Sequence, residues 1–329
     1  MPRLLAPSAL ALTLVLTACG AEDGGSASSS PGDGEHPVTV QNCGAEVRFE
    51  RAPEQLLLLK SAAVPYLHAL DVLDRVTARA GQYPAAYYDD ATLAALEDIP
   101  LLTDELDSSG HLQISKEVVI AQEPDLVLGQ VDNLSRDSLA AVGIPVLEEP
   151  ALCDTAGSER PGFDDVDEQL RTYGRVFGRP DRAATAVAAL DERLAAVEAE
   201  VGGPSGRTAA VLYPTVGGGT TYAYGNRSMA DPQLAAAGLE NVFADVDERV
   251  FEVTLEELLG RDPDVLVLLH SEGDPDEVVR AVTDLPGADQ LTAVAHGDLL
   301  PQLFNFTEPP SPLAVEGLER IVERFGGTP

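Results

Sequence analysis

One pattern of hydrophobic and polar positions occurs twice along the chain. Residues 114–128 and 253–267 each contain a hydroxyl residue, a carboxylate in the next turn, an acidic residue followed by Pro-Asp, and an aliphatic run. The hydroxyl residues Ser115 and Thr254 predict helix N-caps, and the proline predicts the end of each helix. A continuous aliphatic run is typical of a strand that is buried on both faces. Each copy therefore predicts a short helix that leads into a strand of a parallel sheet.

The two copies predict two similar α/β lobes with a cleft between them. Other apolar runs predict additional strands at 55–59, 76–80 and 143–147 in the first lobe, and at 207–213 and 220–224 in the second. The triple glycine 217–219 joins two of these strands, and no Lys-Ser/Thr pair follows it, so it is not a phosphate-binding loop.

A long helix is predicted between the lobes. After a helix at about 164–177, Gly178 and Pro180 indicate a stop and a new start. The next stretch has apolar residues at spacings of three and four, namely Val187, Leu190, Leu194, Val197 and Val201. This helix is interpreted as a rigid connector. The alternative is an ordinary helix that covers one lobe.

Candidate binding residues follow from the rule that ligands of open α/β sheets bind at the carboxyl ends of strands. In the first lobe these are Lys60, Ser61, Tyr83, Tyr87, Tyr88 and Gln130. In the second lobe they are Tyr222, Tyr224, Asn226, Arg227, His270, Phe304 and Phe306. Lys60 and Arg227 are expected to donate hydrogen bonds to ligand oxygens. Alternatively, about half of the tyrosines only pack lobe surfaces, and Arg227 points to solvent.

The N-terminus predicts a lipid anchor. Arg3 precedes an apolar stretch, residues 4–16, that is too short to span a bilayer, and Leu16-Thr-Ala-Cys-Gly20 follows it directly. This pattern is typical of a bacterial lipoprotein signal, residues 1–18, with lipid on Cys19. The alternative is an ordinary secretory signal. Residues 19–36, rich in Gly, Ser and Asp, predict a flexible tether from the outer face of a cell membrane.

The remaining cysteines, Cys43 and Cys153, form an even pair in an oxidising compartment, so a disulfide is predicted. The alternative is two free thiols. No histidine lies near either cysteine at metal-ligand spacing, which disfavours a metal site there.

Charge and motifs exclude several functions. The formal charge of −34, or −35 once Arg3 leaves with the signal, excludes nucleic acid as a partner and disfavours anionic lipid surfaces. The simplest interpretation of this acidity is a solvated surface that keeps an exported protein soluble. The five histidines form no catalytic or metal-binding motif, and no Gly-x-Ser-x-Gly is present. An enzyme, a bound cofactor and a metal site are therefore not predicted.

Several segments, taken in order, resemble the periplasmic binding proteins that serve ferric siderophore, haem and vitamin B12 importers. The segments are 56–76, 114–128, 224–245 and 253–269, with the lipoprotein signal before them and the long helix between the second and third. The resemblance implies two three-layer α/β lobes joined by a single long connecting helix. It also implies an ABC permease with its ATPase as partners, and a monomeric protein. The domain limits are then 37–162, 163–203 and 204–329.

One segment departs from the family pattern. Relatives often carry a permease-docking Glu in the first-lobe helix, where this chain has Pro65, so no docking residue is assigned there.

The candidate residues of the cleft include tyrosines, phenylalanines and a few side chains that donate hydrogen bonds. Such a set suits a bulky iron complex with hydroxamate or carboxylate oxygens. A triply anionic ferric catecholate needs a basic pocket, and only Lys60, Arg79, Arg227 and Arg249 are near plausible cleft positions. A ferric hydroxamate siderophore is therefore preferred. The alternatives are haem, cobalamin or a bare Zn or Mn ion.

Overall fold

The computed structural model describes residues 36–107, 111–153 and 160–326. The predicted signal peptide, the predicted lipidation site Cys19 and most of the predicted tether lie outside these residues. All described residues belong to one compact unit, residues 32–329. Within the described ranges, no helix combines the length and the hydrophobicity that crossing a membrane requires.

The N-terminal half contains a four-stranded parallel sheet, in the order β4-β3-β5-β6 among the described residues. A β1-β2 hairpin precedes this sheet. The strands are β1 (Val38–Asn42), β2 (Ala45–Phe49), β3 (Leu56–Leu58), β4 (Val76–Arg79), β5 (Leu126–Leu128) and β6 (Val146–Leu147). The helices are α1 (Val64–Ala69), α2 (Asp90–Asp98), α3 (Lys116–Ile120) and α4 (Arg136–Ala140). The predicted strands at 55–59, 76–80 and 143–147 are thus confirmed, with shorter ends.

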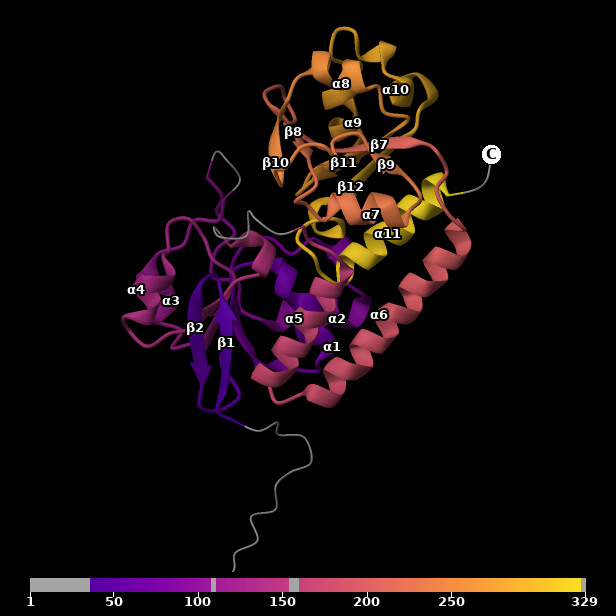
Figure 1. The fold of residues 1–329 in the computed structure, drawn as a ribbon. Coiled ribbons are helices and arrows are strands. Elements are labelled where there is room, and N and C mark those ends of the chain that lie inside the picture. The colour runs from indigo at the N-terminus through magenta and orange to yellow at the C-terminus, as the bar shows by residue number, and fades with distance from the viewer. Residues whose placement is uncertain (1–35, 108–110, 154–159, 327–329) are drawn as a thin grey trace, which may run out of the picture. The chain divides into compact units, whose positions relative to one another are not determined.

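The C-terminal half contains a mixed six-stranded sheet with β10-β8-β7-β11-β12 in order and β9 paired to β7. Its strands are β7 (Thr208–Pro214), β8 (Thr221–Tyr224), β9 (Glu240–Asn241), β10 (Val250–Val253), β11 (Val265–His270) and β12 (Leu299–Leu303). Its helices are α7 (Ala230–Ala236), α8 (Leu255–Arg261), α9 (Pro275–Thr283), α10 (Thr292–His296) and α11 (Pro312–Phe325). Strand β11 pairs in parallel with β7 and β12, whereas β8 is antiparallel to β7. Figure 1 shows the two halves and the helices around them.

The repeated sequence unit has the predicted helix ends in both halves. The hydroxyl of Ser115 accepts a hydrogen bond from the backbone of the first turn of α3, and Thr254 does the same for α8. The acidic residues before the prolines, Glu123 and Asp262, adopt left-handed backbone conformations with φ of 51° and 42°. The left-handed residue lies three residues after the end of α3 and one residue after the end of α8, and the strand begins two residues beyond each proline.

The aspartate after each proline performs the same task in both halves. Asp125 accepts hydrogen bonds from the backbone N–H groups of Glu54 and Gln55, just before β3. Asp264 accepts bonds from the backbone and the hydroxyl of Thr208, at the start of β7. In each half the carboxylate therefore fixes the amino end of the neighbouring parallel strand. The repeated sequence unit therefore has the same structural role in both halves, which is to align two neighbouring parallel strands.

Helix α6 (Pro180–Val201) connects the two hydrophobic cores, after α5 (Phe163–Val176). Val187 and Leu190 belong to the N-terminal core, whereas Val197 belongs to the C-terminal core. The predicted apolar stripe therefore changes its partner core along the helix, as a connector requires. Figure 1 shows α6 running from beside α5 and α1 toward α7 and α11.

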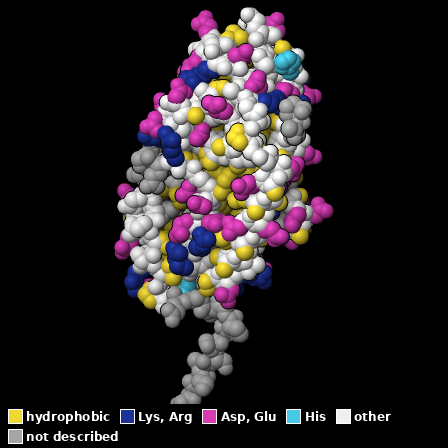
Figure 2. All heavy atoms as spheres, turned by 45° about the vertical axis from the view of Figure 1, so that its right-hand side comes forward, with side chains coloured by type: hydrophobic (Ala, Val, Ile, Leu, Met, Phe, Trp, Pro, Cys, Tyr) yellow, Lys and Arg dark blue, Asp and Glu magenta, His cyan; other side chains and the backbone are white. Residues whose placement is uncertain are grey.

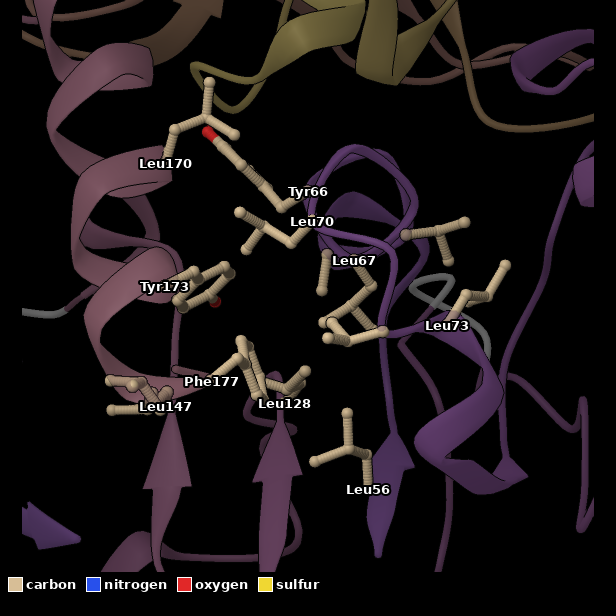
Figure 3. Close-up of a cluster of buried hydrophobic side chains, with 14 of the residues drawn as sticks. Leu56, Tyr66, Leu67, Leu70, Leu73, Leu128, Leu147, Leu170, Tyr173 and Phe177 are labelled. Atoms are coloured by element: carbon tan, nitrogen blue, oxygen red, sulfur yellow. The ribbon is translucent and has the colours of Figure 1, made fainter. Parts of the chain in front are cut away.

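The N-terminal core joins α1, α5 and the parallel sheet. Tyr66 and Tyr173 pack edge to face, with ring centroids 5.4 Å apart, and Tyr173 continues to Phe177 at 5.8 Å. Figure 3 shows these rings between the two helices, above Leu56 and Leu128 of the sheet. The Tyr66 hydroxyl donates a 3.0 Å hydrogen bond to the carbonyl of Pro310, just before α11. The N-terminal core is therefore tied to the last helix of the chain.

Candidate functional site

A cavity of about 650 Å³ lies where strand ends of the two sheets approach each other. The segment after β4 forms one side, and the end of β11, strand β12 and α11 form the other. Residues of the lining that carry polar or aromatic groups are Arg79, Gln82, Tyr83, Asp104, His270, Glu272, Gln302, Phe306 and Arg320. Carboxyl ends of parallel strands are the expected ligand position in this architecture, and the volume is typical of small-molecule sites.

On the N-terminal side, an arginine lies over a tyrosine. Arg79, the last residue of β4, donates from Nε to the carbonyls of Leu96 and Ile99 at 3.0 and 3.3 Å. Its guanidinium carbon lies 5.0 Å from the centroid of the Tyr83 ring. The Tyr83 hydroxyl donates to the carbonyl of Ala80, and burial raises the pKa of Tyr83 well above its ordinary value. Tyr83 therefore stays neutral. The Arg79 guanidinium, held in place by the two carbonyls, and the Tyr83 ring both line the cavity.

The C-terminal side has a matching pair. Arg320 of α11 places its guanidinium carbon 4.0 Å from the centroid of the Phe306 ring. The same guanidinium donates to Glu316 one turn earlier, at 2.7 Å. Each side of the cavity therefore offers an arginine stacked on an aromatic ring, a combination that suits planar, electron-rich ligand groups.

A buried hydrogen-bond relay fixes the orientation of Gln302 in the cavity wall. Gln233 donates from its amide nitrogen to the carbonyls of Phe306 and Ala314, at 2.6 and 2.8 Å. Its amide oxygen must therefore accept the Thr307 hydroxyl, whose oxygen in turn accepts from the Gln302 amide nitrogen, at 2.8 Å in both steps. Because the single Thr307 hydroxyl proton is already donated to Gln233, exchanging the nitrogen and oxygen of the Gln302 amide would place two acceptor oxygens against each other. The relay holds this part of the wall rigid.

Three of the predicted residues line the cavity, namely Tyr83, His270 and Phe306. Three more lie beside it, where the two halves touch. The Tyr87 hydroxyl accepts from the backbone of Asn305 at 2.9 Å, and the Asn305 side chain donates to the Ser61 hydroxyl at 3.1 Å. Tyr87 also packs edge to face on Phe306 and on Tyr88. Ser61, Tyr87 and Tyr88 therefore join the halves next to the cavity rather than lining it.

Lys60 and Gln130 are bound by a carboxylate that the sequence analysis did not select. The Lys60 ammonium and the Gln130 backbone N–H both lie 2.7 Å from the same oxygen of Glu148, which is 1% exposed. Neither residue lines the cavity. Glu148 and Glu149 directly follow strand β6, so the rule of strand ends points to them as well. Lys60 thus neutralises a buried carboxylate of its own chain.

The other predicted residues of the C-terminal half lie outside the cavity lining. Tyr224 is buried in the C-terminal core, and the amide of buried Asn226 donates to the Ala244 carbonyl. Arg227 forms an ion pair with Asp247, and Tyr222 is exposed on β8. Because β8 runs antiparallel to β7, its carboxyl end lies toward the amino end of β7 and away from the strand ends that border the cavity.

Phe304 packs on Tyr213 instead of lining the cavity, with ring centroids 6.1 Å apart. Arg249 binds the fully buried Glu308 at 2.9 Å. Burial raises the pKa of Glu308, and Arg249 opposes that rise. Both arginines that the sequence placed near the cleft in this half, Arg227 and Arg249, therefore have carboxylate partners within the chain.

Cys43 and Cys153 form a disulfide in the structure. It ties the turn of the β1-β2 hairpin to the segment that follows β6. In the part of the chain that the structure describes, no group of three His, Cys, Asp or Glu side chains is arranged to hold a metal ion.

Comparison with known proteins identifies the fold's relatives. A crystal structure titled as an ABC-type Fe³⁺-hydroxamate transport system, from Saccharomonospora viridis, is 61% identical, with a TM-score of 0.85 over 89% of this chain and all of that one. A periplasmic haem-binding protein of Roseiflexus shares the fold at 19% identity, with a TM-score of 0.63 over 83% of this chain and 98% of that one.

A cobalamin-binding protein of Halobacterium salinarum is 29% identical over 66% of this chain, and the match covers 57% of that longer protein. The family described as periplasmic binding protein matches residues 58–300. The fold of two α/β halves, the cavity at their strand ends and this match agree, and the chain belongs to the periplasmic binding protein family.

Proposed function

We propose that this protein is the extracytoplasmic substrate-binding lipoprotein of an ABC importer, and that it captures a ferric hydroxamate siderophore for delivery to the permease. The cavity carries this proposal. Its lining contains two arginines, Arg79 and Arg320, and two carboxylates, Asp104 and Glu272, so the lining has no excess of positive charge that would favour an anionic complex. A ferric trihydroxamate has a neutral iron core with six oxygens, which arginine donors can bind without a large net charge.

The charge of the whole protein supports the same ligand class. Acidic side chains are spread over the face that Figure 2 shows, in keeping with the formal charge of −34. This field repels a triply anionic ferric catecholate and attracts a cationic complex. The 61% identical protein, whose title names Fe³⁺-hydroxamate transport, supports the proposal independently.

Haem is the second candidate, and His270 is the observation that favours it. His270 lines the cavity, and its Nδ1 lies 3.1 Å from the carbonyl of Glu272. With the proton on Nδ1 in that contact, Nε2 is the nitrogen that is able to bind iron. Cobalamin remains an alternative through the Halobacterium salinarum relative.

A ligand panel distinguishes these candidates. We expect a ferric trihydroxamate to bind more tightly than a ferric tricatecholate, haemin, cyanocobalamin or Zn²⁺ and Mn²⁺ ions. Quenching of tyrosine fluorescence reports binding directly, since the chain has eight Tyr and no Trp. Arg79→Ala should weaken hydroxamate binding by about ten- to a hundredfold, because one charge-assisted hydrogen bond is lost.

Arg280→Ala is the matched control, because Arg280 lies on α9 and does not line the cavity. Its affinity should equal that of the wild type. Tighter binding of the catecholate at both low and moderate salt would contradict the hydroxamate proposal. A Soret shift with haemin that His270→Ala abolishes would establish the second candidate instead.

We further propose that the protein is held at the outer face of the cell membrane by lipid on Cys19. The apolar segment followed by Leu16-Thr-Ala-Cys-Gly20 supports this anchor. Cys19→Ala should prevent labelling with palmitate and release the exported protein into the soluble fraction. A variant that stays in the membrane fraction would show that another segment anchors the protein.

A further inference from the structure

Glu272 is an exposed carboxylate of the cavity lining that has no cation partner among the described residues. It follows β11, and its side chain accepts a 2.8 Å hydrogen bond from the amide nitrogen of Gln82, on the opposite side of the cavity. A neutral amide satisfies one carboxylate oxygen but leaves the negative charge uncompensated. The contact therefore marks a position from which an N–H group can donate to Glu272. The group that donates there, the Gln82 amide, is neutral.

The charged side chains of the lining leave a negative surplus in the cavity as a whole. Arg320 is already neutralised by Glu316, which lies outside the lining, at 2.7 Å. The remaining lining charges are Arg79 and Asp104 in the N-terminal half and Glu272 in the C-terminal half, and neither carboxylate has an ion-pair partner in the described ranges. With the Arg320–Glu316 pair counted as neutral, the cavity carries one uncompensated negative charge.

We propose that Glu272 selects ferric hydroxamates that carry a free ammonium group over neutral ones. This inference rests on the proposed function and specifies its ligand further. The ammonium takes the position that the Gln82 amide marks, donates to the Glu272 carboxylate and neutralises the surplus charge. The iron core then faces the stacked arginines Arg79 and Arg320. The acidic surface of the protein attracts the same cationic complex at long range.

The test compares two probes that share one iron core. Ferrioxamine B carries a terminal ammonium, and its N-acetyl derivative is neutral. We expect wild-type protein to bind ferrioxamine B about three- to tenfold more tightly, the range for a partly exposed ion pair that includes a charge-assisted hydrogen bond. Glu272→Gln keeps an oxygen that accepts from Gln82, so the cavity wall is preserved. This variant should bind both probes with affinities within about twofold of each other, because the charge contribution alone is lost.

Glu277→Gln separates the local effect from the long-range field. Glu277 lies on α9, five residues beyond Glu272, and does not line the cavity. Both variants remove one negative charge, so their long-range fields change equally. Glu277→Gln should therefore keep the wild-type preference for ferrioxamine B.

Each outcome distinguishes this inference from the proposed function. If folded wild-type protein binds neither probe, the proposed function itself fails. If wild-type protein binds both probes equally, the hydroxamate function stands and the ammonium preference is wrong. If the preference survives in Glu272→Gln, or is lost equally in Glu277→Gln, Glu272 is not the selecting residue.

Discussion

Replacing Glu149 with Gln is expected to make the protein more stable than the wild type at pH 8 and above, by up to roughly 5 kcal/mol. Glu149 is 4% exposed, and burial, followed by the nearby Glu148 carboxylate, raises its pKa to about 8 from an ordinary value of 4.5. The Tyr173 hydroxyl, which donates to one oxygen of Glu149 at 3.1 Å, and Lys60 oppose this rise.

The sign follows from the proton balance. Between about pH 4.5 and 8 the folded protein keeps a proton on Glu149 that the unfolded chain has released. The stabilisation from this group is thus complete below pH 4.5 and is lost as the pH rises to 8, at roughly 1.4 kcal/mol per unit. Glutamine imitates the protonated carboxyl at every pH. The two proteins should therefore be equally stable at pH 4 and should diverge steadily above it.

Chemical denaturation at pH values from 4 to 9 measures this difference. Glu97→Gln, on the exposed face of α2, is the matched control and should leave the pH profile of the wild type in place. Glu308 is also buried with a raised pKa, so some pH dependence remains in Glu149→Gln. Parallel profiles for the wild type and Glu149→Gln would show that Glu149 is ionised in the folded protein.

Removing the disulfide is expected to cost about 2 to 4 kcal/mol. Cys43 and Cys153 are separated by 110 residues, and closing a loop of this length lowers the entropy of the unfolded chain by an amount worth up to ~4 to 5 kcal/mol. A Cys43→Ser and Cys153→Ser double variant should lose most of this stabilisation, with binding at the cavity retained because neither cysteine lines it.

Thiol counting on a soluble form that begins at Ala21 gives the direct measurement. We expect no reactive thiol without reductant and two after reduction in denaturant. Two free thiols in the untreated protein would contradict the disulfide. The wild type under reducing conditions is the control for the double variant, and the two should unfold at the same denaturant concentration.

Much of the fold follows from local sequence signals. The caps at Ser115 and Thr254, the stops at Pro124 and Pro263 and the stripe of α6 are patterns within short segments, and the structure shows each one in its predicted place. The strands of the C-terminal half that the sequence analysis did not assign, β9, β10 and β12, are short or partly exposed. Strand β12 contains Pro301 and is only partly buried, so it lacks the continuous apolar run of its parallel partner β11.

Fewer residues of the candidate site than elements of the fold could be predicted. The end of the sheet at which a strand finishes depends on whether that strand runs parallel or antiparallel to its neighbours. The strand-end rule selects Tyr83 and His270, and both line the cavity, since β4 and β11 run parallel to their neighbours. It fails for Asn226 and Arg227, which follow the antiparallel β8. Sequence order alone does not distinguish these two cases, since pairing direction depends on how distant segments meet. The strand-end rule also fails for Lys60 and Gln130, which follow parallel strands but are bound by the buried Glu148 outside the cavity.

The sequence by itself determined the repeated α/β unit, the connecting helix, the paired cysteines and the acidic character, because each depends on composition or on residues close together in the chain. Only the tertiary structure decided which side chains face the cavity and which charges are already neutralised. Lys60 and Glu148 are 88 residues apart, and Gln82 and Glu272 are 190 apart. Such pairs form only when folding brings distant strand ends together, and at that point buried charges take partners within the chain. Glu272 is different among the described residues of the cavity lining, because its partner Gln82 is neutral, and this is the observation on which its proposed role in ligand selection rests.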